Sequence, residues 1–238
     1  MTQPAVEAVL LDVGGVVLLP ERAAVLGRLA RAGVRVHPDR LDRGHYEALA
    51  AIERPTAYTV ARASLGYATA YLRAIGVGED RINAAEEELF RPDQSFRVGW
   101  LQVRDGAMDE LRALVATGVR LAIVSNADGT IEEELRALGV CQAGPGPGVP
   151  VVAVIDSAVV GVAKPNPRIF ELALAAVGTP PARTVHVGDT LTYDLAGARA
   201  AGIHPVHYDP FRICGGDGHD DVASLVDLIP LLGRGQDG

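Results

Sequence analysis

Residues 8–17 read AVLLDVGGVV, and the first predicted element of the fold lies in this stretch. The apolar run from Ala8 to Leu11 stops at Asp12, which makes it too short for a membrane span or a signal peptide. A short apolar run bounded by turn residues is typical of a buried strand. We therefore predict a strand at Ala8–Leu11 with Asp12 at its carboxyl end.

Short apolar runs alternate with helix-period segments over most of the remaining chain. Near-continuous apolar strands separated by amphipathic helices indicate a parallel sheet covered on both faces, and so an α/β fold. We predict further strands at Val119–Val124, Val151–Ile155, Thr184–Val187 and Ile203–Tyr208. We predict helices at Ala107–Thr117, Thr130–Leu138, Arg168–Val177, Asp194–Ala201 and Val222–Leu232.

Residues 21–92 break this alternation. They carry helical patterns, such as Glu21–Ala32 and Tyr58–Ile75, but no convincing strand. We interpret them as a helical insert, which leaves residues 1–20 and 93–238 as the core domain.

The composition narrows the class of protein. A formal net charge of −8 argues against a nucleic-acid partner, because phosphate backbones are bound by clustered Lys and Arg. Two cysteines provide no disulfide framework, and residues 1–7 carry no basic leader. We expect a cytoplasmic monomer or homodimer with no membrane contact.

The candidate site residues lie just after the predicted strands or in the loops beside them. Ligands of open parallel sheets bind at the carboxyl ends of the strands. The sole lysine of the chain lies in the loop before the Arg168 helix, although the other basic residues are all arginine. Each group alone is typical of a turn, a cap or a solvated surface. Together they converge on one edge of the sheet: Asp12, Ser125, Asn126, Lys164, Asp189 and Asp194.

These residue types suit phosphoryl transfer. Asp12 could be the nucleophile, while Ser125, the amide of Asn126 and Lys164 hold the transferring oxygens. A carboxylate that attacks a phosphate needs a hard divalent cation, for which Mg²⁺ is the usual choice. The metal ligands we expect are Asp12, the main-chain carbonyl of Gly14, and Asp189. Asp194 would bind the cation directly or orient a water bound to it.

Four ordered motifs resemble the haloacid dehalogenase superfamily of hydrolases. They are DVGGVV at 12–17, VSN at 124–126, KPNPRIF at 164–170, and VGD at 187–189 continuing to Asp194, with Gly197-Ala198 and Ala201-Gly202. The resemblance covers essentially the whole chain. It implies a Rossmann-like core, a helical cap at residues 21–92 that closes over the substrate, and a small phosphorylated substrate.

The chain departs from the family pattern at Gly14, where phosphatases of the family usually carry a second Asp as general acid and base. Some branches that open Asp-x-Gly-Asn or Asp-x-Gly-Gly still resemble working phosphatases. Three alternatives remain: a metal-free dehalogenase, a phosphonate hydrolase, and a catalytically silent binding protein. The retained Gly188-Asp189 and Asp194 disfavour the first, and the absence of lysine from residues 21–92 disfavours the second.

Two other patterns near the carboxyl terminus resemble metal sites. His204 and His207 are three residues apart on a predicted strand and so face opposite sides, which excludes a metal pair. The Gly215–Asp221 run, GGDGHDD, lacks the terminal glutamate of a calcium loop, and we predict a surface turn there.

Overall fold

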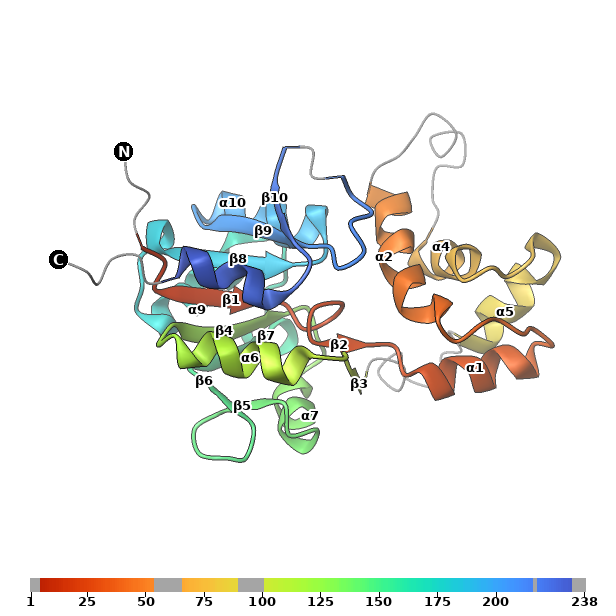
Figure 1. Ribbon diagram of the computed structural model, residues 1–238, viewed down its shortest axis with the longest axis horizontal. Helices are drawn as coiled ribbons and strands as arrows, with labels where there is room; N and C mark the ends of the chain where they lie inside the picture. Colours follow the sequence, from red (N-terminus) through yellow and green to blue (C-terminus); the bar gives the residue numbers. More distant parts are fainter. Residues whose placement is uncertain (1–4, 54–65, 90–100, 216–217, 233–238) are drawn as a thin grey trace. The chain divides into compact units, whose positions relative to one another are not determined.

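A computed structural model describes residues 5–53, 66–89, 101–215 and 218–232. Its core is a six-stranded sheet of order β10-β9-β8-β1-β4-β7, and every neighbouring pair in it is parallel (Figure 1). The predicted parallel α/β fold is therefore confirmed. The strands are β1 (Ala8–Leu11), β4 (Arg120–Ser125), β7 (Ala153–Asp156), β8 (Thr184–Gly188), β9 (His204–Tyr208) and β10 (Asp220–Val222).

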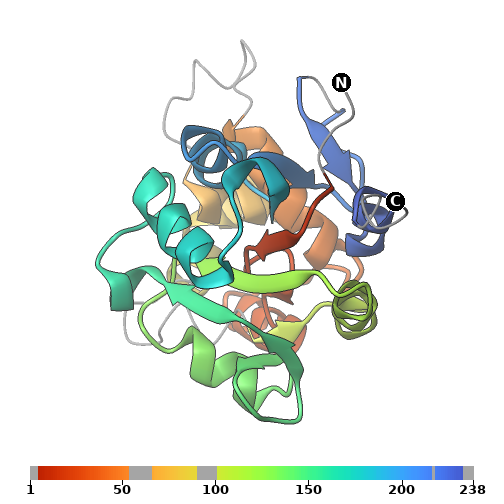
Figure 2. The same ribbon diagram turned by 90° about the vertical axis from the view of Figure 1, so that its left-hand side faces the viewer.

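Helices cover both faces of this sheet. On one side, α9 (Pro167–Val177) packs on β4 and β7, and α10 (Ala196–Ala200) packs on α9 and β9. On the other side, α6 (Ala107–Ala116) lies against η5 (Leu225–Leu231), as Figure 2 shows. All four residues of β1 are fully buried between these layers, which explains why the run carries no polar residue before Asp12.

Helix ends in the core follow the local sequence. Asn166 caps α9 by accepting a hydrogen bond from the amide of Arg168 (3.0 Å), with Pro167 at the first helical position. Glycines at 118, 139 and 202 adopt left-handed backbone just after α6, α7 (Ile131–Ala137) and α10. The predicted stops of these helices are therefore confirmed.

Three predicted elements differ from the structure. The run Val151–Ile155 divides between β6 (Val149–Val151), which pairs with β5 (Cys141–Ala143) in a separate sheet, and β7 in the main sheet. The helix predicted at Asp194–Ala201 begins earlier, as a π-helical turn at η4 (Leu191–Leu195) that leads into α10.

The helix predicted at Val222–Leu232 is shorter in the structure and is a 3₁₀ helix at Leu225–Leu231. Asp220–Val222 joins the main sheet as β10. The last two residues of the surface turn predicted at Gly215–Asp221 therefore lie in a strand, and the prediction is wrong for them. A capping box at Ser224 and Asp227 then starts η5, a 3₁₀ helix that contains Pro230. The ring of a proline clashes with the carbonyl four residues before it in an α-helix, which disfavours an α-helix around Pro230.

The described chain divides into two compact units. The first consists of residues 1–17, 103–212 and 216–238 and contains the main sheet. The second consists of residues 18–102 and 213–215. Its helices are α1 (Arg22–Arg31), α2 (Arg40–Glu53), α4 (Tyr67–Ala74), η1 (Glu79–Arg81) and α5 (Ile82–Leu89).

The helical unit has an apolar core of its own. Leu29, Leu41, Tyr71 and Ile75 are buried together in it. Where α2 meets α4, a Cβ at Gly44 would lie 2.4 Å from the Ile75 side chain, so glycine is required for the close approach. The helix predicted at Glu21–Ala32 is confirmed by α1. The part of the predicted Tyr58–Ile75 helix before residue 66 lies outside the described residues.

The remaining short elements are β2 (Leu18–Leu19), β3 (Gln102–Val103), α8 (Ser157–Val160) and η3 (Pro181–Arg183), with β2 paired to β3. Among the described helices, none combines the length and apolar character that crossing a bilayer requires.

Candidate active site

The register of the sheet places three predicted site residues at one edge. Leu11 of β1 pairs with Ile123 of β4 and with Val187 of β8. Asp12 and Asp189, which follow β1 and β8, and Ser125, the last residue of β4, therefore lie at the same end of the sheet, and all three are buried. The prediction that polar groups gather at the carboxyl ends of the strands is confirmed for these residues.

Lys164 bridges two of the carboxylates. Its Nζ lies 2.7 Å from Asp12 Oδ1 and 2.7 Å from Asp194 Oδ1, and its side chain is 2% exposed. Asp12 is separated from Lys164 by more than 150 residues along the chain, so only the fold brings them together. The only lysine in the sequence thus lies in the cluster of predicted site residues.

Asn126 holds the backbone of Lys164. Its Oδ1 accepts from the Lys164 amide (2.8 Å), and its Nδ2 donates to the Lys164 carbonyl (3.0 Å). This reciprocal pair uses both polar groups of the Asn126 side chain. The sequence pattern suggested the main-chain amide of Asn126 for phosphate binding, and these side-chain contacts leave that amide unaffected.

Asp194 is fixed by residues that the sequence did not single out. His186, fully buried within β8, places Nε2 2.9 Å from Asp194 Oδ1. Thr190 donates to Asp194 Oδ2 through its amide (3.2 Å) and through its hydroxyl. His186 lies in a run that was predicted to be a buried strand, and a buried polar side chain without a partner costs free energy. A histidine at this position therefore indicated a polar partner nearby.

Gly188 permits this packing. A Cβ at this position would lie 2.1 Å from Asp194 Cγ, well inside van der Waals contact. Any other residue would displace the Asp194 carboxylate from Lys164. The glycine of the VGD motif is therefore explained by close approach within the cluster.

The turn after Asp12 is anchored to the core by Arg104. The Arg104 Nε donates to the Val16 carbonyl (2.8 Å), and its amide donates to the Val17 carbonyl (2.9 Å). Its guanidinium also pairs with Glu110 of α6. Gly14, which is half-buried, lies in this turn two residues beyond Asp12.

The cluster has the ligand types and the charge for one divalent cation. Carboxylate oxygens of Asp12, Asp189 and Asp194 all lie within 4.8 Å of one another. Oxygens on opposite sides of a Mg²⁺ ion are about 4.2 Å apart, so small adjustments would bring all three to it. Three carboxylates and the Lys164 ammonium leave an excess of two negative charges, which a divalent cation would neutralise.

A model of the haloacid dehalogenase-like hydrolases matches residues 6–202. The chain belongs to this family. It is 36% identical over 152 residues to the human haloacid dehalogenase-like hydrolase domain-containing protein 3, an alignment that covers 61% of this chain and 57% of the relative. The chain therefore spans little more than half the length of that relative.

Two further comparisons agree with the family. A phosphoserine phosphatase from Thermus thermophilus is 45% identical over 56 residues, which are 24% of this chain and 22% of that enzyme. A crystal structure of a phosphatase of the family from Thermococcus onnurineus superimposes with a TM-score of 0.56 at 21% identity, covering 95% of this chain and 98% of the other. This structural likeness supports the fold.

The two carboxylates that Lys164 bridges have pKa values shifted in opposite directions. Burial raises the pKa of the Asp12 carboxyl to about 7, and the charge of Asp194 adds to the rise against the opposing effect of Lys164. The pKa of Asp194 is lowered: burial opposes its charge, but the Lys164 ammonium and the His186 hydrogen bond outweigh burial. A bound divalent cation would favour the ionised form of Asp12.

The raised pKa of Asp12 predicts how the stability of the metal-free protein depends on pH. An unfolded Asp has a pKa of about 3.9, so the folded protein binds this proton more tightly. Its contribution to stability is fully present below about pH 4 and is lost as the pH rises to about 7. In EDTA, urea unfolding from pH 4.5 to 7 should show a loss of up to about 1.4 kcal/mol per pH unit, which Asp12→Asn removes.

The exposed Asp109 on α6 offers a matched control, because Asp109→Asn should leave this slope unchanged. The lowered pKa of Asp194 changes the stability only below about pH 4, which is outside the range from pH 4.5 to 7 that is measured. An identical slope in wild type and Asp12→Asn would contradict the placement of Asp12 in a buried, negatively charged cluster.

Proposed function

We propose that this chain is a Mg²⁺-dependent phosphatase that acts on a small phosphorylated metabolite through an aspartyl-phosphate on Asp12. The single observation that carries the proposal is the placement of Asp12 beside Lys164 and within reach of two further carboxylates. A carboxylate at the end of a strand becomes a useful nucleophile when its own charge and that of its substrate are both compensated nearby.

The proposed cation ligands are Asp12, Asp189, Asp194 and the carbonyl of Gly14. Asp194 would bind the cation either directly or through a water, and its hydrogen bonds to His186 and Thr190 would orient it in either case. When bound, Mg²⁺ would offset the repulsion between the Asp12 carboxylate and the substrate phosphate.

Two displacements complete the proposed reaction. In the first, an Asp12 carboxylate oxygen attacks phosphorus, and the bond to the ester oxygen breaks, so the alcohol leaves as an oxyanion that takes up a proton. In the second, water attacks the aspartyl-phosphate, which releases inorganic phosphate and restores the Asp12 carboxylate. Ser125, the amide of Asn126 and Lys164 would hold the phosphoryl oxygens throughout.

The phosphatase proposal is supported over a dehalogenase by the retained carboxylates. A cation beside Asp12 would hinder attack on carbon and departure of halide, whereas it assists attack on a phosphate dianion. The name of the Thermus thermophilus relative, a phosphoserine phosphatase, also supports a phosphatase. We assign residues 21–92 the role of the substrate-selecting cap and expect the protein to work in the cytoplasm.

The first activity prediction concerns Asp12. Asp12→Asn keeps the size of the side chain but removes the nucleophilic oxygen, so phosphate release from an aryl phosphate with Mg²⁺ should fall to background. Asp109→Asn should retain full turnover as the matched control. With wild type, rapid quenching and mass spectrometry should detect one phosphoryl group on the peptide that contains Asp12.

Full turnover by Asp12→Asn, with unchanged circular dichroism, would place the chemistry elsewhere. Full activity of wild type in EDTA, accompanied by halide release from a haloacid, would instead favour the metal-free dehalogenase. Absence of turnover from every phosphate ester tested with Mg²⁺ would favour the silent binding protein.

The second activity prediction concerns the missing acid at Gly14. Glycine offers no proton to the leaving group, so aryl and acyl phosphates should be cleaved much faster than alkyl phosphates. Gly14→Asp should raise turnover of alkyl phosphates selectively, by up to about 100-fold, the lower end of the usual gain from general acid–base catalysis. Measured kcat against leaving-group pKa tests this directly.

Gly14→Asn is the matched control, because it introduces a side chain of the same size without an acidic proton. It should leave the dependence on leaving-group pKa as steep as in wild type. A flat dependence in wild type would contradict this account of Gly14, since it would mean that another group already protonates the leaving oxygen.

A further inference from the structure

A second group of potential metal ligands lies on the side of β8 away from β1, on β9 and in the connection that leads from β9 to β10. The ring of His207 on β9 faces the ring of His219, which immediately precedes β10. His207 Nδ1 and His219 Nε2 are 3.3 Å apart, and the ring centroids are 5.0 Å apart at an angle of 76°. The sequence pattern suggested His204 as the neighbour to consider, but His204 instead pairs with Asp220 (2.9 Å).

The separation of the two nitrogens fits a shared ion. Zinc–nitrogen bonds are about 2.0–2.1 Å, so two imidazoles on one tetrahedral ion have nitrogens about 3.4 Å apart. The observed 3.3 Å is close to that spacing. Two protonated rings would repel each other at this distance, so at least one of them presents a lone pair to the other.

The tautomer of His207 is suited to binding a metal. Its Nε2 lies 3.2 Å from the main-chain carbonyl of Asp189, and a carbonyl oxygen only accepts. Nε2 therefore carries the proton, and Nδ1 of the neutral ring is left with its lone pair directed at His219. A backbone carbonyl that orients the far nitrogen of a histidine is the usual second shell of a histidine metal ligand.

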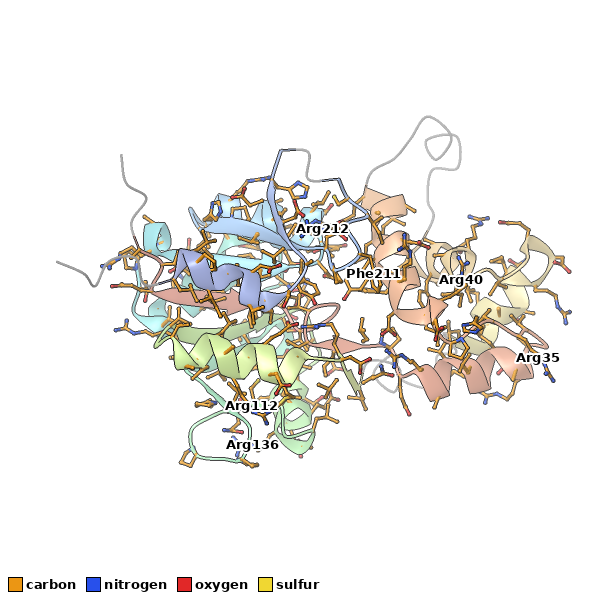
Figure 3. All side chains as sticks on the ribbon, viewed as in Figure 1. Arg35, Arg40, Arg112, Arg136, Phe211 and Arg212 are labelled. Atoms are coloured by element: carbon orange, nitrogen blue, oxygen red, sulfur yellow. The ribbon has the colours of Figure 1, made fainter. Side chains whose placement is uncertain are left out.

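The chain supplies a thiol between these histidines. Cys214 is seven residues after His207 and five before His219, in the connection from β9 to β10. The ends of this connection are adjacent, because β10 pairs with β9 through Val222 and Tyr208. Arg212 of the same connection reaches Asp221 of β10 (3.4 Å); Figure 3 labels this arginine.

We propose that His207, His219 and Cys214 form a binding site for a divalent transition-metal ion, for which Zn²⁺ fits best. Imidazole and thiolate are ligands of borderline to soft character, which Zn²⁺ accepts and Mg²⁺ does not favour. The ligand types therefore separate this site from the all-oxygen cluster around Asp12. The ion would tie the β9–β10 connection to the core and, through His207, to the backbone of Asp189.

Calorimetric titration of the EDTA-treated 238-residue chain with Zn²⁺ tests the proposal, with excess Mg²⁺ present to occupy the carboxylate cluster. Wild type should bind one Zn²⁺ and gain thermal stability. His219→Ala should weaken binding by more than the roughly 10- to 100-fold that loss of a second-shell partner costs. His219 is only partly buried, so this variant should fold, and far-ultraviolet circular dichroism checks that it does.

His204→Ala is the matched control, because it removes a histidine from the same strand that faces the opposite side. It should bind Zn²⁺ as wild type does. Co²⁺ provides the readout for the thiol: the wild-type complex should show sulfur-to-cobalt charge-transfer absorption, which Cys214→Ser should lose while binding more weakly.

Three results would overturn the proposal. The first is absence of stoichiometric Zn²⁺ binding by wild type, which would make the histidine pair an N–H···N hydrogen bond only. The second is equal Zn²⁺ affinity of His219→Ala and wild type, which would place the ion elsewhere. The third is an unchanged cobalt spectrum in Cys214→Ser, which would remove the thiolate from the site.

Discussion

The ion-pair cluster of Lys164 with Asp12 and Asp194 is the interaction on which the rest of the site depends. One ammonium lies between two carboxylates at equal distances of 2.7 Å, and all three groups are buried. Breaking a buried pair by removing one partner typically costs about 3–5 kcal/mol, because the remaining charge is left uncompensated. The cluster therefore constrains the end of β1, the loop before α9, and η4 at once.

Several neighbouring residues hold Lys164 and Asp194 in this arrangement. Asn126 fixes the backbone of Lys164 from the end of β4, and Gly188 leaves the space that Asp194 fills. His186 and Thr190 hold the two oxygens of Asp194 from β8 and from the start of η4. Each contact reduces the freedom of a charged group, which is how a protein prepares a site for a charged substrate in advance.

The burial and the net charge of the cluster explain why a cation belongs there. Burial raises the pKa of Asp12 first, and the charges of Asp194 and Asp189, which one ammonium cannot fully compensate, raise it further. A protonated Asp12 would be a poor nucleophile. A divalent cation would replace that proton and leave the carboxylate ionised, so metal binding and activation of the nucleophile are the same event in this account.

The sequence predicted the strand ends well because buried parallel strands are short apolar runs, and Asp12, Ser125 and Asp189 follow directly after them. It predicted Lys164 from its isolation among arginines. The roles of His186, Thr190 and the Asn126 side chain were not predictable, because they depend on contacts between segments that only the folded chain brings together. The same reason hid the pairing of His207 with His219, since Asp220–Val222 was not recognised as a strand.

Errors near the carboxyl terminus have a common physical origin. The apolar spacing of Val222–Leu232 suits a helix, but Pro230 and the cap at Ser224 favour a short 3₁₀ helix, and β10 uses Val222 to extend the sheet. Pairing with β9 and burial against the sheet outweigh local propensity there.

The number of protons released when Mg²⁺ binds tests the central claim most directly. It can be measured by calorimetry in buffers of different ionisation enthalpy, at pH 6 and at pH 8. With a pKa of about 7 for Asp12, the account predicts release of nearly one proton per Mg²⁺ at pH 6 and very little at pH 8. Asp12→Asn should release none at either pH. Equal release at both pH values in wild type, or the same release from Asp12→Asn at pH 6, would contradict the claim that the cation displaces a proton from Asp12.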